Sequence, residues 1–232
     1  MVSPASNHHR QAISAGYFPG MRQPARHFSF HAILPPRLDL AALDRHLAER
    51  FLIAIEPMRS RVGGEAGPNG EAALAFTWRA MQLASGLLQA MKVPSFDPGF
   101  IIGLSSAPAN DQGMVVTCAL PVTEGIDPDL TVRCMKLAYR MLFQLADATL
   151  SEAAVRSLLE ELNEKFIEPA AAQIAAGTST IPLLESAFRQ DMPFRHLGAG
   201  VYQLGWGARM MLFDRSACSL DSAIGAQSSH NK

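Results

Sequence analysis

The sequence contains few cysteines, almost no net charge and no long apolar run. Its three cysteines, Cys118, Cys134 and Cys218, are too few and too widely spaced for a disulfide framework or a zinc site, and each lies in an apolar context. Lys and Arg number 20 against 21 Asp and Glu, so the net charge is −1, which argues against the basic footprint of a nucleic-acid-binding or membrane-surface protein. No stretch approaches the roughly 20 apolar residues of a membrane-spanning helix.

The composition is that of a globular protein with a substantial core. Of the 232 residues, 48% are hydrophobic and 18% are charged, and the length suits one large domain or two small ones. Residues 1–25 form a polar arm interspersed with Pro, Gly and His, and they lack the basic-then-apolar layout of a signal peptide. We therefore expect a flexible N-terminal arm and a cytoplasmic location.

Apolar residues that recur at intervals of three and four predict several helices. These helices cover about 40–55, 71–92, 128–146, 150–176 and 181–189. Asp39 is the expected N-cap of the first helix, and Thr149 with Glu152 forms the capping box of the fourth. Pro169 is expected to kink the fourth helix, because proline has no amide hydrogen to donate. The third and fourth helices together make a long helical pair.

The strand-like segments are grouped rather than alternating with the helices. They cover 26–34, 99–104 and 114–120 in the first part of the chain, and 194–197, 200–206 and 208–213 near its end. This grouping predicts an α+β fold with a small mixed sheet, a long helical pair and a C-terminal β-meander. We assign residues 26–190 to an α+β domain, and residues 191–232 to a β-rich segment followed by the start of a helix.

No complete catalytic or metal site is visible in the sequence. His27 and His31 lie four residues apart in a strand, which separates them by about 13 Å, too far to share one ion. Glu160, Glu164 and Glu168 share a helix face at a spacing of four, which is typical of a solvated face. We assign no catalytic residue and no metal ligand.

Polar and aromatic side chains concentrate among glycines near the C-terminus. Arg195, Tyr202, Gln203 and Arg209 lie in a segment that is otherwise apolar. The planar fork of an arginine can bind a carboxylate or a phosphate, so these four residues are the candidates for substrate binding. The alternative interpretation is a tight β-meander whose two arginines face solvent.

Four short motifs follow one another in the same part of the chain. They are Gly200-Val-Tyr-Gln-Leu-Gly-Trp-Gly-Ala-Arg209, Asp214-Arg-Ser216, Asp221-Ser-Ala-Ile-Gly225 and the terminal Asn-Lys232. In this order they resemble cyanophycin synthetase and its ATP-grasp relatives, in which a Gln-Leu-Gly-Tyr-Gly strand pair and an Asp-Arg-Thr-Ser-Ala-Ile turn precede a helix that ends in Asp-Lys. Here Trp206 stands in place of the tyrosine and Asn231 in place of the aspartate, and the turn motif is divided in two.

The resemblance implies that this chain is the N-terminal region of an ATP-dependent carboxylate–amine ligase of the ATP-grasp type. Such an enzyme activates a carboxylate as an acyl phosphate, which an amine then attacks. This region would hold the amino-acid or peptide substrate and support assembly into a homo-oligomer. The resemblance places ATP and Mg in a following ATP-grasp domain, so no cofactor is expected in residues 1–232.

A non-catalytic oligomerisation or protein-interaction domain is the alternative function. Val132, Met135, Tyr139 and Leu142 give the helix at 128–146 a second apolar face, more than one side of a small core requires. The two hypotheses differ in whether the gene continues into an ATP-grasp domain.

Overall fold

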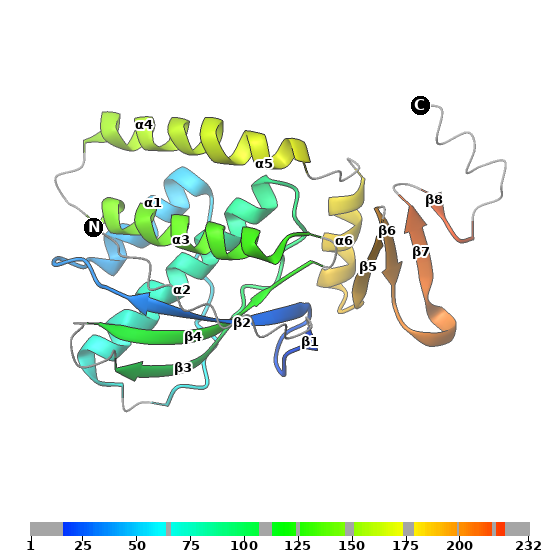
Figure 1. Cartoon of the computed structure of the whole chain (residues 1–232), viewed down its shortest axis with the longest axis horizontal. Coiled ribbons are helices and arrows are strands. Elements are labelled where there is room, and N and C mark those ends of the chain that lie inside the picture. Colours follow the sequence, from blue (N-terminus) through cyan, green and yellow to red (C-terminus); the bar gives the residue numbers. More distant parts are fainter. Residues whose placement is uncertain are drawn as a thin grey trace.

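A computed structural model of the chain shows an α+β protein with two antiparallel sheets (Figure 1). The structure describes residues 16–63, 66–106, 113–123, 126–146, 151–173, 179–198, 200–214 and 217–220. The structure confirms the predicted α+β class. The helix expected from about residue 221 and the predicted helix end at Gly177 lie outside the described residues.

Helices and strands follow one another in the grouped order that the sequence predicts. In chain order they are β1 (Gly16–Tyr17), β2 (Pro24–Ala32), α1 (Leu40–Phe51), α2 (Gly67–Ala90), β3 (Phe100–Ser106), β4 (Met114–Pro121), α3 (Pro128–Leu145), α4 (Glu152–Leu162), the π-helical turn η1 (Asn163–Ile167), α5 (Glu168–Gln173), α6 (Thr180–Arg189), β5 (Phe194–Gly198), β6 (Val201–Leu204), the 3-10 turn η2 (Gly207–Arg209), β7 (Met211–Asp214) and β8 (Ala217–Cys218).

The first sheet has the strand order β1-β2-β4-β3. The prediction of a mixed sheet is wrong, because every ladder in it is antiparallel. Strands β2 and β3 are joined through α1 and α2 and run in the same direction, but β4 inserts between them and pairs with both. The parallel pairing is limited to an isolated bridge between Ser60 and Ile101.

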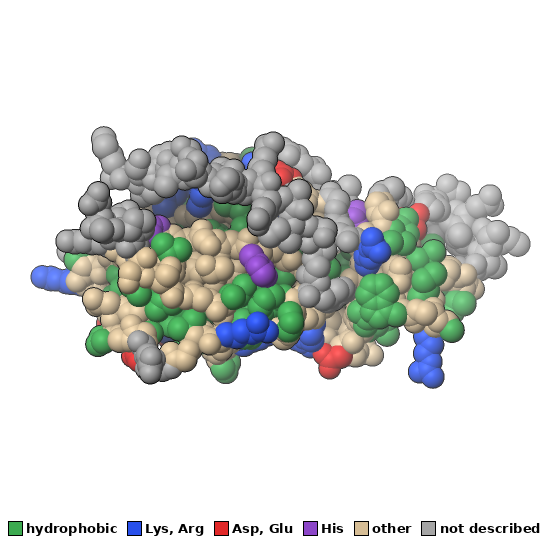
Figure 2. Space-filling model, turned by 60° about the horizontal axis from the view of Figure 1, so that its bottom comes forward, with side chains coloured by type: hydrophobic (Ala, Val, Ile, Leu, Met, Phe, Trp, Pro, Cys, Tyr) green, Lys and Arg blue, Asp and Glu red, His purple; other side chains and the backbone are tan. Residues whose placement is uncertain are grey.

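Helices α1 to α3 lie on one face of this sheet, and α4 lies on the far side of α3, as Figure 1 shows. Phe28 and Phe30 of β2 point toward the helices, as the alternation in the sequence predicts, and pack against a core that includes the fully buried Phe76 and Trp78 of α2. Within the described ranges, no helix lies on the opposite face of the sheet, and Figure 2 turns this side of the molecule forward.

The helix termini follow local capping chemistry, with one correction. Asp39 caps α1 as predicted, and its side chain accepts a hydrogen bond from the Ala42 amide. The capping box predicted for the fourth helix is wrong, because α4 begins at Glu152 and its N-cap is Ser151, whose hydroxyl accepts from the Ala154 amide. Thr149 lies outside the described residues.

The proline in the fourth predicted helix coincides with a local change in helix type. The turn η1 ends at Ile167, two residues before Pro169, and the Glu168 amide donates to the carbonyl of Asn163, five residues earlier. A π-helical turn opens the hydrogen-bond pattern where proline cannot supply a donor. The predicted kink is therefore accommodated by widening the helix, which continues as α5.

Part of the predicted flexible arm belongs to the folded domain. Residues 16–25 contain β1 and the start of β2, and Met21 and Gln23 are buried. These residues belong to the fold because of a tertiary contact. Met21 packs against Ala119 of β4, on the face of the first sheet that is opposite the helices. Residues 1–15 lie outside the described part of the chain.

The second sheet is a meander with the order β5-β6-β7-β8. It has a core of its own, formed with one face of α6, which the sequence analysis had grouped with the first domain. The core residues are Leu184, Ala187, Phe188, Phe194, Tyr202 and Leu204. The predicted third strand at 208–213 is shortened, because Gly205 and Gly207 adopt positive φ angles and the chain forms η2 before β7.

None of the helices in the described part of the chain is long and apolar enough to span a membrane.

The three cysteines differ in their accessibility to reagents. Cys118 and Cys134 are buried and Cys218 is half-buried. Burial raises the pKa of the Cys134 thiol to about 12 and the pKa of the Cys118 thiol well above its usual range. In the native protein at pH 8 we expect the disulfide reagent DTNB to react rapidly with Cys218 alone, and with all three thiols in urea. Rapid reaction of a second thiol in the native protein would contradict this assignment.

Candidate functional site

Two of the four predicted binding residues lie side by side on the second sheet. Arg195 of β5 and Gln203 of β6 are direct cross-strand partners, so their side chains share the face that points away from α6. Arg195 is exposed, and the Gln203 side-chain amide donates to the Gly205 carbonyl at 3.0 Å. This pair offers a guanidinium and an amide oxygen on an open β surface.

Tyr202 lies on the opposite face of the same strand. Only 7% of it is exposed, and it packs in the core beside the ring of His196, with 4.8 Å between ring centroids. Burial raises the pKa of its phenol. Because successive residues of a strand point to opposite faces, Tyr202 cannot join Arg195 and Gln203 in one site. We therefore assign Tyr202 to the core.

Arg209 lies in the turn that joins β6 to β7. It is the last residue of η2 and is exposed, as is the neighbouring Trp206, whose exposed fraction is 50%. The structure thus separates the predicted site into a strand pair, a core tyrosine and a turn arginine. Of these, Arg195 and Arg209 are exposed and Gln203 is half-buried.

The histidines and glutamates that the sequence places at a spacing of four lie on exposed faces. His27 and His31 both lie on the exposed face of β2 at the spacing that keeps them apart. Glu160, Glu164 and Glu168 are exposed on α4, η1 and α5. Within the described ranges, no three His, Cys, Asp or Glu side chains are grouped as a metal would require.

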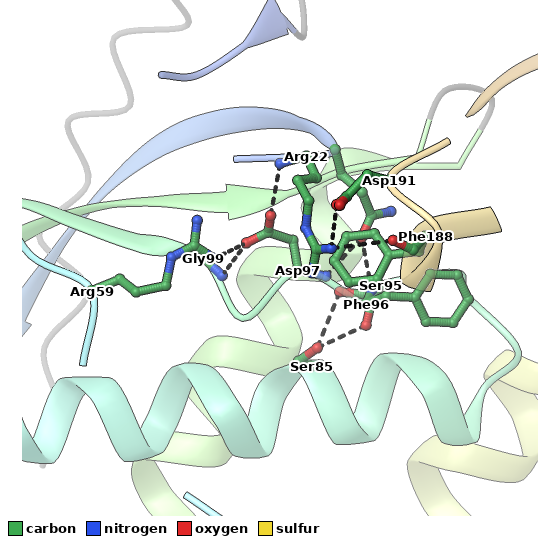
Figure 3. Close-up of polar contacts among 10 residues, drawn as sticks. Arg22, Arg59, Ser85, Ser95, Phe96, Asp97, Gly99, Phe188 and Asp191 are labelled. Atoms are coloured by element: carbon green, nitrogen blue, oxygen red, sulfur yellow. Dashed lines mark hydrogen bonds and ion pairs between the residues drawn. The ribbon is translucent and has the colours of Figure 1, made fainter. Parts of the chain in front are cut away.

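A buried carboxylate, which the sequence analysis did not single out, organises the connection before β3 (Figure 3). Asp97 is fully buried and accepts three hydrogen bonds, from the Arg22 amide at 2.8 Å, the Arg59 guanidinium at 2.9 Å and the Gly99 amide at 3.0 Å. Gly99 has a φ of 90°, and a Cβ there would lie 2.7 Å from the carbonyl oxygen of Ala119, so this turn requires glycine.

The same network joins the two sheets. The Arg22 guanidinium stacks on the Phe188 ring at 3.8 Å and pairs with Asp191 at 2.8 Å, just after α6. On the other side, the Phe96 ring contacts Phe188 (Figure 3). It also contacts Phe194 of the second core. The segment around Asp97 is therefore the contact between the first domain and the C-terminal meander.

No local pattern in the sequence identifies this network. Its members come from residues 22–23, 59, 95–99 and 188–191, which are far apart along the chain. The one local signal is the Asp97-Pro-Gly99 turn, and that signal does not reveal burial.

Comparison with the models of known protein families gives no match, and a search of the curated proteins gives none either.

Proposed function

We propose that this chain is the N-terminal region of an ATP-grasp carboxylate–amine ligase, where it holds an amino-acid or peptide substrate and supports assembly. The observation that carries the proposal is the position of the segment that resembles the family. Residues 200–214 and 217–220 belong to a meander with its own core, which is attached to the first domain through the contact at Asp97. A small β unit with a core of its own is suited to pack against a further domain.

The surface of the meander supports the same proposal. Leu197, Trp206, Met210 and Leu220 are large apolar side chains that are exposed in this unit. Exposed apolar side chains gathered on one small unit are typical of a surface that another domain covers. ATP and Mg would bind in that following domain, and no residue of this chain is assigned to them.

The alternative of an oligomerisation domain loses its main support. Met135 and Leu142 of α3 are fully buried, and Tyr139 and Val132 are half-buried. The Tyr139 ring packs on Phe30 and Phe76 and its hydroxyl bonds to Thr77, so the second apolar face of α3 is used largely within the chain. The proposed assembly would therefore have to use a different surface from this face of α3.

The first test is the gene itself. We expect the reading frame to continue past the codon for Lys232 into a glycine-rich ATP-grasp domain, and the full-length product to release ADP when it is given ATP, Mg and an amino acid or peptide. A stop codon at that position, or no ADP release with any amino acid or peptide, would overturn the proposal.

The second test addresses the predicted binding residues in the full-length enzyme. Arg209→Ala is expected to raise the KM for the amino-acid or peptide substrate by about tenfold, the effect of losing roughly 1.4 kcal/mol from a charge-assisted hydrogen bond. Arg156→Ala is the matched control, because Arg156 is exposed on α4, away from the meander. An unchanged KM for Arg209→Ala would remove Arg209 from the site.

A further inference from the structure

A histidine side chain closes the turn of the β5–β6 hairpin. His196 is half-buried and is the direct cross-strand partner of the core residue Tyr202, so its ring lies on the face of the second sheet that packs on α6. The Nε2 atom of His196 accepts a hydrogen bond from the Gly200 amide at 3.2 Å. A neutral imidazole accepts at one nitrogen and donates at the other, so this bond requires the tautomer with its proton on Nδ1. The bond therefore depends on the protonation of the ring.

The backbone around this bond is irregular. The register of the two strands shifts between His196 and Gly198, and Gly198 and Gly200 have φ angles of 104° and 82°. A bulge interrupts the ladder of backbone hydrogen bonds, and glycines restrain a turn little. The side-chain bond to Gly200 thus supplies a restraint where the ladder is interrupted. It lies next to the cross-strand pair formed by Arg195 and Gln203.

The surroundings of the ring contain few groups that change charge near neutral pH. In the described part of the chain, the titratable side chains on this side of the second sheet are Tyr202 of β6, Cys218 of β8, and Glu185 and Arg189 of α6. Tyr202 contacts the ring, and burial raises the pKa of its phenol, so it stays uncharged below pH 8. Glu185 and Arg189 pair with each other at 2.5 Å. Among these groups, an imidazole is the one whose ordinary titration lies between pH 5 and 8.

The charged side chains of the neighbouring strands do not face the ring. Arg195 is opposite Gln203, which is opposite Leu212, and Asp214 is opposite Val201. Because these residues alternate with His196, Tyr202 and Phe213 along their strands, they belong to the other face of the sheet.

We propose that His196 is a pH-sensitive latch of the β5–β6 hairpin. When the ring is neutral, Nε2 accepts from the Gly200 amide and the turn is closed. When Nε2 takes up a proton from solvent, both ring nitrogens are donors, so the Gly200 amide loses its acceptor and faces another N–H group. The bond is therefore present at the alkaline end of the range and is lost as the pH falls. Its loss loosens the pairing that holds Arg195 beside Gln203, and this conclusion does not depend on the ligase proposal.

Solution NMR of the 232-residue chain at pH 8 and pH 5 tests the latch. At pH 8 we expect a coupling through the hydrogen bond between the Gly200 amide nitrogen and His196 Nε2, and we expect it to vanish at pH 5. Solvent exchange of the Gly200 amide, corrected for the intrinsic effect of pH on exchange, should accelerate about tenfold at pH 5, the effect of losing one hydrogen bond. The amides of β4 serve as the internal reference and should keep their corrected rates.

Two variants of His196 separate the latch from a general effect of acid. His196→Gln keeps an oxygen that can accept from the Gly200 amide but has no ionisation in this range, so its corrected exchange rate should be equal at both pH values. His196→Phe keeps a ring beside Tyr202 without an acceptor, so Gly200 should exchange rapidly at both. His27→Gln, which changes a histidine of the first sheet, is the matched control and should respond to pH like the parent.

Three results would overturn the proposal. The first is the absence of the coupling at pH 8, and the second is a corrected Gly200 exchange rate of the parent that is equal at the two pH values. The third is a pH response in His196→Gln as large as that of the parent, which would assign the effect to another group.

Discussion

Replacing Asp97 with alanine is expected to lower the free energy of unfolding by about 3 kcal/mol, the lower end of the cost of breaking a buried ion pair. The substitution leaves the Arg22 and Gly99 amides without their acceptor and Arg59 without its partner. The Arg59 side chain is 30% exposed and can reach water, which keeps the cost from being larger. Urea unfolding followed by circular dichroism measures the change.

Asp191→Ala is the matched control for the Asp97 prediction. Asp191 belongs to the same network through Arg22, but its side chain is 75% exposed. Exposed ion pairs contribute less than about 1 kcal/mol, so this variant should unfold close to the parent. If Asp97→Ala were no more destabilised than Asp191→Ala, the buried carboxylate would not be what holds this connection together.

Because the network joins the two sheets, Asp97→Ala should also loosen the meander. Asp97 holds the backbone of Arg22, and Arg22 contacts Phe188 and Asp191 at the end of α6. We expect faster amide hydrogen exchange in β5 and β6 of the variant, while the exchange of β2 and β4 changes less. Equal acceleration in both sheets would show that the carboxylate stabilises the whole fold without a special role at the contact.

Trp78→Ala is expected to lower the free energy of unfolding by about 3–5 kcal/mol, the usual cost of removing a large aromatic side chain from a core. Trp78 is only 1% exposed, and its indole N–H donates to the Glu56 carbonyl at 2.8 Å. The variant therefore loses buried apolar area together with the hydrogen bond to the Glu56 carbonyl. This loss is large compared with the total stability of a typical domain, about 5–15 kcal/mol.

The second tryptophan of the chain provides the control. Trp206 is half exposed at the end of β6, so Trp206→Ala should change the stability by less than about 1 kcal/mol. The two variants also separate the fluorescence signals of the two tryptophans. If Trp78→Ala unfolded at the same urea concentration as Trp206→Ala, α2 would not be the centre of the first core.

Local sequence patterns were sufficient to predict most of the helices and strands, but few of the functional assignments. The β3–β4 hairpin and the stripe of α3 follow from residue periodicity, because side-chain spacing alone places apolar residues on one face. The Asp39 cap follows from one side chain and one nearby amide. Of the candidate site residues, Tyr202 lies on the buried face of β6, which grouping residues by composition does not reveal because it ignores the alternation of a strand.

The remaining features depend on segments that meet only in the folded chain. The antiparallel sheet requires β4 to insert between β2 and β3, and the burial of Asp97 requires Arg22 and Arg59 to converge on it. The Arg61 guanidinium, which stacks on the Phe18 and Phe100 rings, likewise unites three separate segments. The amino-acid sequence on its own is enough to define the helices, the strands and the α+β class, because these depend on neighbours along the chain. Strand order, the contact between the two sheets and the composition of a binding surface depend on contacts across long stretches of sequence, so the tertiary structure decides them.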